Sequence, residues 1–197
     1  MVKLTKKYTF EGPAGKVSLE DLFEGRKQLL IYHFMFGPDS TEGCSSCSFF
    51  GDHIPDLRHL NSRNTTFVVV SRAPIAKIEA FKKRMGWKFP WYSSYGTDFN
   101  YDFKVTEDEA VAPVEYNFKS KDELEKHGMT DYMRGEQPGM SVFLKDGQDV
   151  FHTYSSYARG NEKLLGGTYL MLDITPFGRQ DGGEGSGLGF PHHDQYE

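Results

Sequence analysis

The chain has 197 residues, a length that predicts one domain with a hydrophobic core of its own. Aromatic residues make up 15% of the sequence, which argues against disorder over most of the chain. The mean hydropathy is −0.58, and the most apolar run is far shorter than the ~20 residues of a membrane-spanning helix. A net charge of −5 without a basic patch argues against nucleic acid and membrane as partners.

The sequence has only two cysteines, Cys44 and Cys47, spaced as C-x-x-C. The Lys-rich N-terminus is not followed by an apolar segment, so we expect no signal peptide and a cytoplasmic protein. A reducing compartment does not keep a structural disulfide oxidised, and cysteines this close in sequence cannot connect distant parts of a fold. The pair is therefore a redox motif, half of a metal site, or a chance occurrence.

The first half of the chain predicts alternating strands and helices. Residues 28–36 (QLLIYHFMF) are apolar on both faces, which is typical of a central strand in a parallel sheet. Two further strands are expected over residues 65–71 and 89–94. We expect a short capped helix, a helix kinked at Pro55 and a helix opened by Pro74, over residues 18–24, 44–62 and 74–86. The pattern is β-α-β-α-β with parallel strands.

The second half is less regular. Residues 96–137 have no clear period, so we expect an insertion that covers part of the sheet, with one helix over residues 120–127. Asp146-Gly147 predicts the turn of a β-hairpin between strands at residues 140–145 and 149–154. A last helix is expected over residues 161–172.

The C-terminal end is rich in glycine. Six of the residues from Gly178 to Gly189 are glycine, which predicts a flexible tail or an arm that is ordered only by packing on something else. We therefore expect a domain over residues 1–177, with its insertion near 96–137, and a tail over 178–197.

The C-x-x-C motif comes directly after a buried strand and a loop, at the start of a helix. Amide N–H groups at a helix start favour a thiolate, and thiols placed there have pKa values of about 3.5–7.5, compared with about 8.5 for a free thiol. Both sulfurs lie on one side of the first turn, close enough to form a bond. We expect Cys44 to be the attacking thiol and Cys47 the shielded resolving thiol.

The two cysteines also suit two roles without redox chemistry. They fit a pair of small buried apolar side chains. They also fit a metal site, since His53 and His59 follow on the same predicted helix, but these two lie roughly 240° apart around it. His192 and His193 in the tail are typical of solvated surface. We therefore predict no metal and no cofactor.

Taken together, the order of elements resembles the thioredoxin fold: a strand, C-x-x-C at the start of a kinked helix, strand, helix, and a hairpin entered after a proline. The segments GPDSTEGCSSCSFFGDHIPDLRHLNSRNTTFVVVSRAPIAKIEAFKKRMGWKFPWYSSYGTDFNYDF and FHTYSSYARG resemble the family known as domain of unknown function 899, over roughly residues 15–175. The resemblance implies an α/β fold with a thioredoxin-like central sheet and flanking helices. It also implies a dithiol–disulfide oxidoreductase, with Cys44 and Cys47 as its active-site pair.

Under the same resemblance, Pro138 is the candidate for the cis-proline that faces the disulfide in thioredoxins and marks where substrate docks. Gly139 intervenes between Pro138 and the expected strand, which departs from that pattern. Gly43 occupies the position where thioredoxins usually have tryptophan, which implies a more open site.

A second resemblance is to the peroxiredoxins. Thr41 stands three residues before Cys44 and follows Pro38, similar to the motif in which a threonine and an arginine polarise peroxide beside a thiolate. Arg72 and Arg134 are candidates for that arginine. Thr41 also suits an ordinary loop or N-cap position. Arg72 lies at a carboxyl edge of the predicted sheet. This position suits binding of an anionic substrate, stabilisation of the Cys44 thiolate, or an exposed charge without a role in the site.

The sequence thus favours a thiol–disulfide oxidoreductase that acts on a disulfide in a protein or a small molecule. The alternatives are a peroxiredoxin-like thiol peroxidase and a redox-sensing binding module. The aromatic residues Trp87, Trp91 and Tyr95 suit the core better than a substrate groove. Whether the protein is a homodimer stays open.

Overall fold

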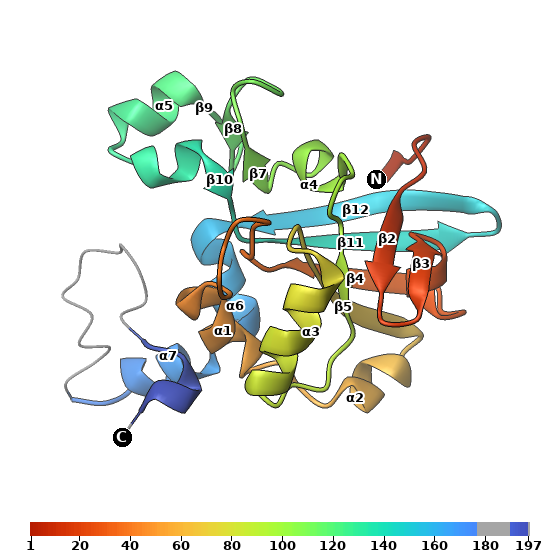
Figure 1. Ribbon diagram of the computed structural model, residues 1–197, viewed down its shortest axis with the longest axis horizontal. Helices are drawn as coiled ribbons and strands as arrows, with labels where there is room; N and C mark the ends of the chain where they lie inside the picture. Colours follow the sequence, from red (N-terminus) through yellow and green to blue (C-terminus); the bar gives the residue numbers. More distant parts are fainter. Residues whose placement is uncertain (177–189, 197) are drawn as a thin grey trace.

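One mixed β-sheet organises the part of the chain that the computed structural model describes, residues 1–176 and 190–196 (Figure 1). Its strand order is β1-β12-β11-β4-β5-β6-β2-β3. Within these described ranges, no helix is long and apolar enough to cross a membrane. The strands are β1 (Val2–Lys3), β2 (Thr9–Gly12), β3 (Gly15–Ser18), β4 (Gln28–His33), β5 (Thr65–Ser71), β6 (Trp91–Ser93), β11 (Gly139–Asp146) and β12 (Asp149–Tyr157).

The centre of the sheet is parallel, as predicted. Strand β4 pairs in parallel with β5, and β5 pairs in parallel with β6. Every residue of β5 is buried, because both faces of the sheet are covered. Strand β11 lies antiparallel to β4 and forms the predicted hairpin with β12. This arrangement confirms the thioredoxin-like α/β fold.

Alternate side chains of β5 fill two different cores, one on each face of the sheet. Phe67 and Val69 pack in the core that also contains side chains of α1 (Ser45–Gly51) and α3 (Ile75–Arg84). Val68 and Val70 pack in the core beneath the insertion. The separation follows from the two-residue period of a strand. Cys47 belongs to the first core, so the candidate site rests on the α1 side of the sheet.

The helix expected over residues 44–62 is broken rather than kinked. It forms α1 and a separate helix α2 (Leu57–Asn61). Pro55 has no amide hydrogen to donate, and Asp56 starts the second helix by accepting a hydrogen bond from the Arg58 amide at 2.9 Å. The break leaves α1 only seven residues long.

Residues 96–137, the expected insertion, pack on the face of the sheet opposite α1 and α3. Its side chains Val105, Val114, Tyr116 and Leu124 belong to the core that contains Val68 and Val70. Ser120 and Glu123 form a capping box at the start of the predicted helix. The elements of the insertion are α4 (Phe99–Asp102), β7 (Thr106–Glu107), β8 (Glu115–Tyr116), β9 (Lys119–Ser120), α5 (Lys121–Lys126), the 3₁₀-helix η2 (Thr130–Met133) and β10 (Gly135–Glu136).

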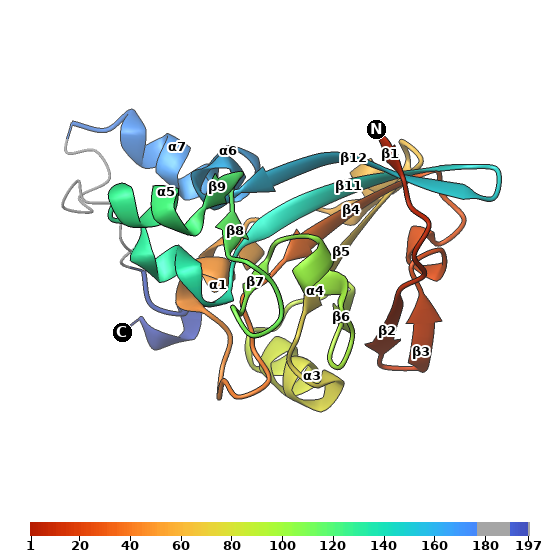
Figure 2. The same ribbon diagram turned by 90° about the horizontal axis from the view of Figure 1, so that it is seen from above.

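The N-terminal strands were not predicted. Strand β1 pairs with β12, and β2 pairs with β6 and β3, so β2 and β3 lie at the opposite end of the molecule from α5 (Figure 2). Residues 18–24 do not form the expected helix. Asp21 accepts hydrogen bonds from the Ser18 amide and hydroxyl, and only a short 3₁₀-helix, η1 (Asp21–Phe23), follows β3.

The last helix of the domain is split in two at Gly166, into α6 (Glu162–Leu165) and α7 (Gly167–Asp173). A side chain at Gly166 would collide with the carbonyl oxygen of Glu162 one turn earlier, so the turn that ends α6 requires glycine. The glycine-rich stretch from residue 178 to 189 lies outside the described residues. Residues 190–196, which include the 3₁₀-helix η4 (His193–Gln195), pack against α1 and α3.

Candidate functional site

Cys44 and Cys47 lie at the start of α1, where the sequence predicted them. Cys44 is the N-cap residue, and Cys47 lies in the first turn of the helix. The amide of Cys44 donates to the carbonyl oxygen of Met35 at 3.0 Å, just beyond the end of β4. Both thiols are free. The central strand therefore fixes where the two sulfur atoms lie.

The surroundings of Cys44 favour its thiolate. A hydrogen bond from the Cys47 thiol is the largest of the effects that lower the pKa of Cys44, and burial opposes it. The amides of Cys47 and Ser46 and the Ser46 hydroxyl provide further donors. Together they lower the pKa of Cys44 to about 6, so that the thiolate predominates at neutral pH.

Cys47 has the opposite environment. It is fully buried, and burial together with the neighbouring Cys44 raises its pKa well above the ordinary value. The Met35 amide donates to its sulfur atom at 3.4 Å, and the Tyr32 hydroxyl also faces it. The site therefore pairs an acidic, partly accessible thiol with a shielded thiol that keeps its proton.

Gly43 precedes Cys44 in a narrow gap between two aromatic rings. A Cβ atom at Gly43 would lie 2.7 Å from ring carbons of both Phe34 and Phe81, which is closer than real Cβ contacts allow. The residue is buried. The expectation of a more open site around Gly43 is therefore wrong, because other aromatic side chains fill the space there.

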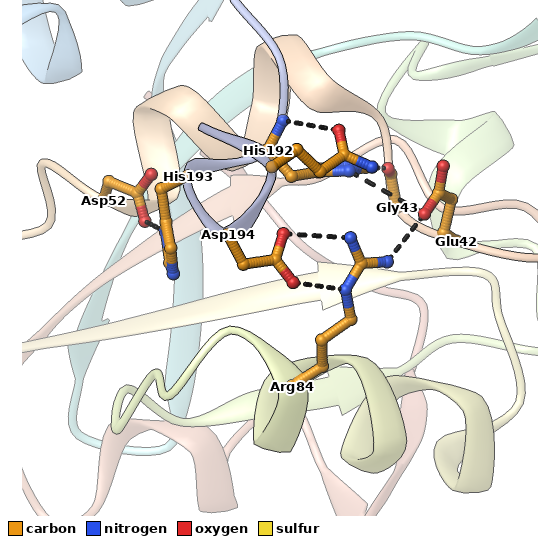
Figure 3. A network of polar contacts seen from close by, with 8 residues as sticks. Glu42, Gly43, Asp52, Arg84, His192, His193 and Asp194 are labelled. Atoms are coloured by element: carbon orange, nitrogen blue, oxygen red, sulfur yellow. Dashed lines mark hydrogen bonds and ion pairs between the residues drawn. The ribbon is translucent and has the colours of Figure 1, made fainter. Parts of the chain in front are cut away.

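The C-terminal segment, defined here as residues 190–196, packs against the loop that carries the cysteines (Figure 3). His192 Nε2 lies 2.9 Å from the carbonyl oxygen of Gly43. Arg84 of α3 bonds to both carboxylate oxygens of Asp194, at 2.7 and 3.0 Å, and to Glu42 at 2.7 Å. One arginine thus connects the segment, the cysteine loop and α3.

The same segment also contacts α1. Phe190 stacks on Phe49 with parallel rings 4.7 Å apart, and His193 Nδ1 lies 2.7 Å from Asp52 at the end of the helix. His192 is only 3% exposed. The interpretation of His192 as solvated surface is therefore wrong, because its ring is packed against Phe81.

Arg72 is paired with Glu136, a residue that the sequence analysis did not single out. Its Nη1 atom lies 2.9 Å from Glu136 Oε1, and its guanidinium lies over the ring of Tyr101 at 4.8 Å. Burial raises the pKa of Glu136, while Arg72 opposes that rise. Arg72 and Arg134 line one cavity of about 430 Å³, so the two candidate arginines are brought together.

Pro138 does not have the predicted conformation. No peptide bond among the described residues is cis, so its assignment as the cis-proline is wrong. The Gln137 amide donates to Val105 at 2.9 Å, and the Pro138 carbonyl accepts from Tyr116 at 2.7 Å. These bonds hold an extended chain into β11, for which the trans isomer, favoured by ~0.5–1 kcal/mol, suffices. Thr41 lies exposed in the cysteine loop.

The other singled-out side chains are mainly structural. Trp91 is buried in the core, whereas Tyr95 is 57% exposed. His53 lies between the Phe49 carbonyl oxygen and the Thr168 hydroxyl, bonds that hold α1 against α7. Among the described residues, no group of His, Cys, Asp and Glu is arranged to hold a metal ion.

Known proteins resemble this chain mainly in fold. The model of a family described as "Bacterial protein of unknown function (DUF899)" matches residues 1–196. No curated protein matches the sequence. The peroxidoxin BcpB of Mycobacterium tuberculosis has 13% identity and a TM-score of 0.53, and the match covers 84% of this chain and 96% of that one.

Two other solved structures are similar at lower TM-scores. PrxQ of Xylella fastidiosa, a cysteine-to-serine mutant, has 13% identity and a TM-score of 0.48, with 85% of this chain and 90% of that chain covered. A candidate protein disulfide isomerase of Bacteroides thetaiotaomicron has 16% identity and a TM-score of 0.48, with 88% and 90% covered.

Proposed function

Because this chain belongs to the DUF899 family and has a thioredoxin-like fold with two free thiols in its first core, we propose that it is a thiol–disulfide oxidoreductase. The observation that carries the proposal is the asymmetry of the pair. The pKa of Cys44 is lowered to about 6, while that of its hydrogen-bonded neighbour Cys47 is raised. An attacking thiol needs a lowered pKa. A resolving thiol needs a raised pKa, so that it stays protonated until the mixed disulfide has formed.

The reaction proceeds in two exchanges. The Cys44 thiolate attacks one sulfur of a substrate disulfide, which forms a mixed disulfide and releases the other sulfur as a thiolate that takes up a proton from water. Cys47 then loses its proton and attacks the Cys44 sulfur. The bond between Cys44 and the substrate breaks, a Cys44–Cys47 disulfide forms, and the second substrate sulfur leaves as a thiolate that takes up the proton released by Cys47. Two electrons pass from the dithiol to the substrate, and a dithiol reductant restores the pair.

Arg72 is the side chain that we assign to substrate binding. Its Nε atom is buried and has no hydrogen-bond partner among the residues that the structure describes, and the side chain lines the cavity that Arg134 shares. A carboxylate on the substrate would accept a hydrogen bond from Nε, which Glu136 leaves free because it bonds to Nη1. Thr41, exposed three residues before Cys44, is assigned to the entrance of the thiol site.

The test is to trap the mixed disulfide. With bis-hydroxyethyl disulfide as substrate, the variant Cys47→Ser should accumulate an adduct on Cys44 that dithiothreitol removes. The matched variant Cys44→Ser should form none, because the buried Cys47 is protonated and shielded. Mass spectrometry of the intact chain measures both. Absence of an adduct in Cys47→Ser contradicts disulfide exchange.

A thiol peroxidase makes a different demand on the same residues. Its thiolate passes through a sulfenic acid that an external thiol can reduce without Cys47. Retained turnover of hydrogen peroxide by Cys47→Ser with dithiothreitol, combined with no disulfide adduct, identifies a peroxidase instead. A redox-sensing module turns over neither disulfide nor hydrogen peroxide, but its binding to a partner changes on oxidation.

A further inference from the structure

His192 is the one side chain of the C-terminal segment that bonds to the backbone beside the reactive cysteine. Its Nε2 atom lies 2.9 Å from the Gly43 oxygen. A carbonyl oxygen only accepts hydrogen bonds, so Nε2 carries the hydrogen and donates it. The Nδ1 atom is buried and lies 3.7 Å from Glu42, too far for a hydrogen bond. The imidazole is thus held by its contact with Gly43 and by its packing against Phe81.

The bond fixes one particular peptide group. The peptide between Gly43 and Cys44 has its carbonyl oxygen bonded to His192 and its N–H bonded to Met35. Gly43 has no side chain of its own to pack. The orientation of this peptide therefore depends on His192 on one side and on the end of β4 on the other. The peptide in turn decides where the Cys44 sulfur lies relative to the donors of the first turn.

The helix that supplies those donors is too short to hold its shape alone. Isolated helices below about 12–15 residues are marginal in water, and α1 has seven residues. The C-terminal segment contacts α1 along its length, through Gly43 before its start, Phe49 in its middle and Asp52 at its end. Figure 3 shows how His192, His193 and Asp194 each reach a different partner.

From this geometry we propose that His192 is a positioning residue of the thiol site, which acts through the Gly43–Cys44 peptide and makes the C-terminal segment an integral part of that site. It does not touch the substrate. It holds the Cys44 sulfur within reach of the donors from Ser46 and Cys47, so that loss of the imidazole N–H lets the thiolate move away from them. The contacts of His192 are independent of the proposed function, and only their effect on the reaction rests on it.

The test uses the full chain with both cysteines and three variants. His192→Leu removes the donor at similar volume, His192→Gln offers an amide N–H in its place, and His193→Leu is the matched control one residue further on. The apparent pKa of Cys44 is measured from the rate of alkylation by iodoacetamide against pH, with the modified residue identified by mass spectrometry. Amide hydrogen exchange over residues 44–48 measures the positioning itself, and thermal melting confirms that each variant folds.

We expect His192→Leu to raise the apparent pKa of Cys44 by about one unit, which lowers the alkylation rate at pH 6 about fivefold. His192→Gln should restore most of the rate. His193→Leu loses only the contact with Asp52 at the other end of α1, so its effect on the pKa of Cys44 should be clearly smaller than that of His192→Leu. An unchanged pH profile and exchange rate in His192→Leu overturns the inference, and so does an equal change in His192→Leu and His193→Leu. If wild-type Cys44 has an ordinary pKa, the proposed function fails, and hydrogen exchange alone still decides the role of His192.

Discussion

The hydroxyl group of Tyr32 faces the sulfur atom of Cys47 inside the core, where it bonds to no nitrogen or oxygen atom of a described residue. Burial raises the pKa of both groups well above their ordinary values. Tyr32 therefore keeps its proton, and its hydroxyl can donate a hydrogen bond to a thiolate. It is placed to stabilise Cys47 at the moment when that thiol becomes a thiolate.

The variant Tyr32→Phe separates the effect of this hydroxyl on the Cys47 thiolate from its effect on the stability of the protein. An unpaired buried hydroxyl costs about 1–3 kcal/mol, so we expect the melting temperature to stay the same or to rise. The release of substrate thiol from the mixed disulfide should become roughly tenfold slower, since the Cys47 thiolate loses a donor. Rapid-quench measurement of that release checks the expectation. Tyr157→Phe, which removes a hydroxyl bonded to Phe103, should alter stability without affecting release.

The lowered pKa of Cys44 predicts how the stability of the reduced protein depends on pH. The folded chain loses the Cys44 proton near pH 6, whereas the unfolded chain keeps it up to about pH 8.5. Between these values the unfolded chain binds more protons, so the free energy of unfolding rises with pH. This contribution is complete above about pH 8.5 and is lost as the pH falls through about 6.

Melting of the reduced wild type and of Cys44→Ser measures that contribution. We expect the difference between their melting temperatures to widen in favour of the wild type from about pH 5.5 to about pH 8.5. Cys47, whose pKa is raised, works against stability only at higher pH. Two melting curves that stay parallel over this range would show that the Cys44 thiolate is not stabilised by the fold.

The parts of the structure that were predicted correctly depend on patterns within a few residues. Strand β5 is a continuous apolar run, and the turn at Asp146 and Gly147 is defined by two residues. The place of Cys44 at a helix start follows from the strand, loop and helix around it. Because these signals are local, the sequence contains them in full.

The parts that were missed depend on contacts between distant residues. His192 and Gly43 are 149 positions apart, and nothing near either residue indicates the other. Arg72 was singled out, but its partner Glu136 comes from the insertion, 64 positions away. The strands β1 and β2 are two and four residues long, so they carry almost no period, and their pairing with β12 and β6 decides that they are strands.

The packing around Gly43 predicts that any side chain at this position destabilises the fold. In Gly43→Ala the new methyl group would meet the rings of Phe34 and Phe81, and overpacking of this kind costs about 1–3 kcal/mol. Urea unfolding measures the loss. Gly37→Ala in the same loop is the control, since its Cβ would have an ordinary contact of 3.4 Å with Glu136. Equal stability of the two variants contradicts the packing described here.

The pairing of Arg72 with Glu136 allows substrate binding to be separated from stability. Arg72→Gln leaves a mostly buried carboxylate without its cation, so we expect a loss of about 1–3 kcal/mol in urea unfolding and a further rise in the pKa of Glu136, which Arg72 now lowers. The KM of Arg72→Gln should rise several-fold for dithiodiglycolate, which carries carboxylates, and stay unchanged for the neutral bis-hydroxyethyl disulfide.

The control variant Glu136→Gln breaks the same ion pair but keeps the guanidinium. If the rise in KM arises from lost binding rather than from damage to the fold, Glu136→Gln should bind dithiodiglycolate at least as well as the wild type does. A parallel loss of activity toward both disulfides in both variants would remove Arg72 from the substrate site.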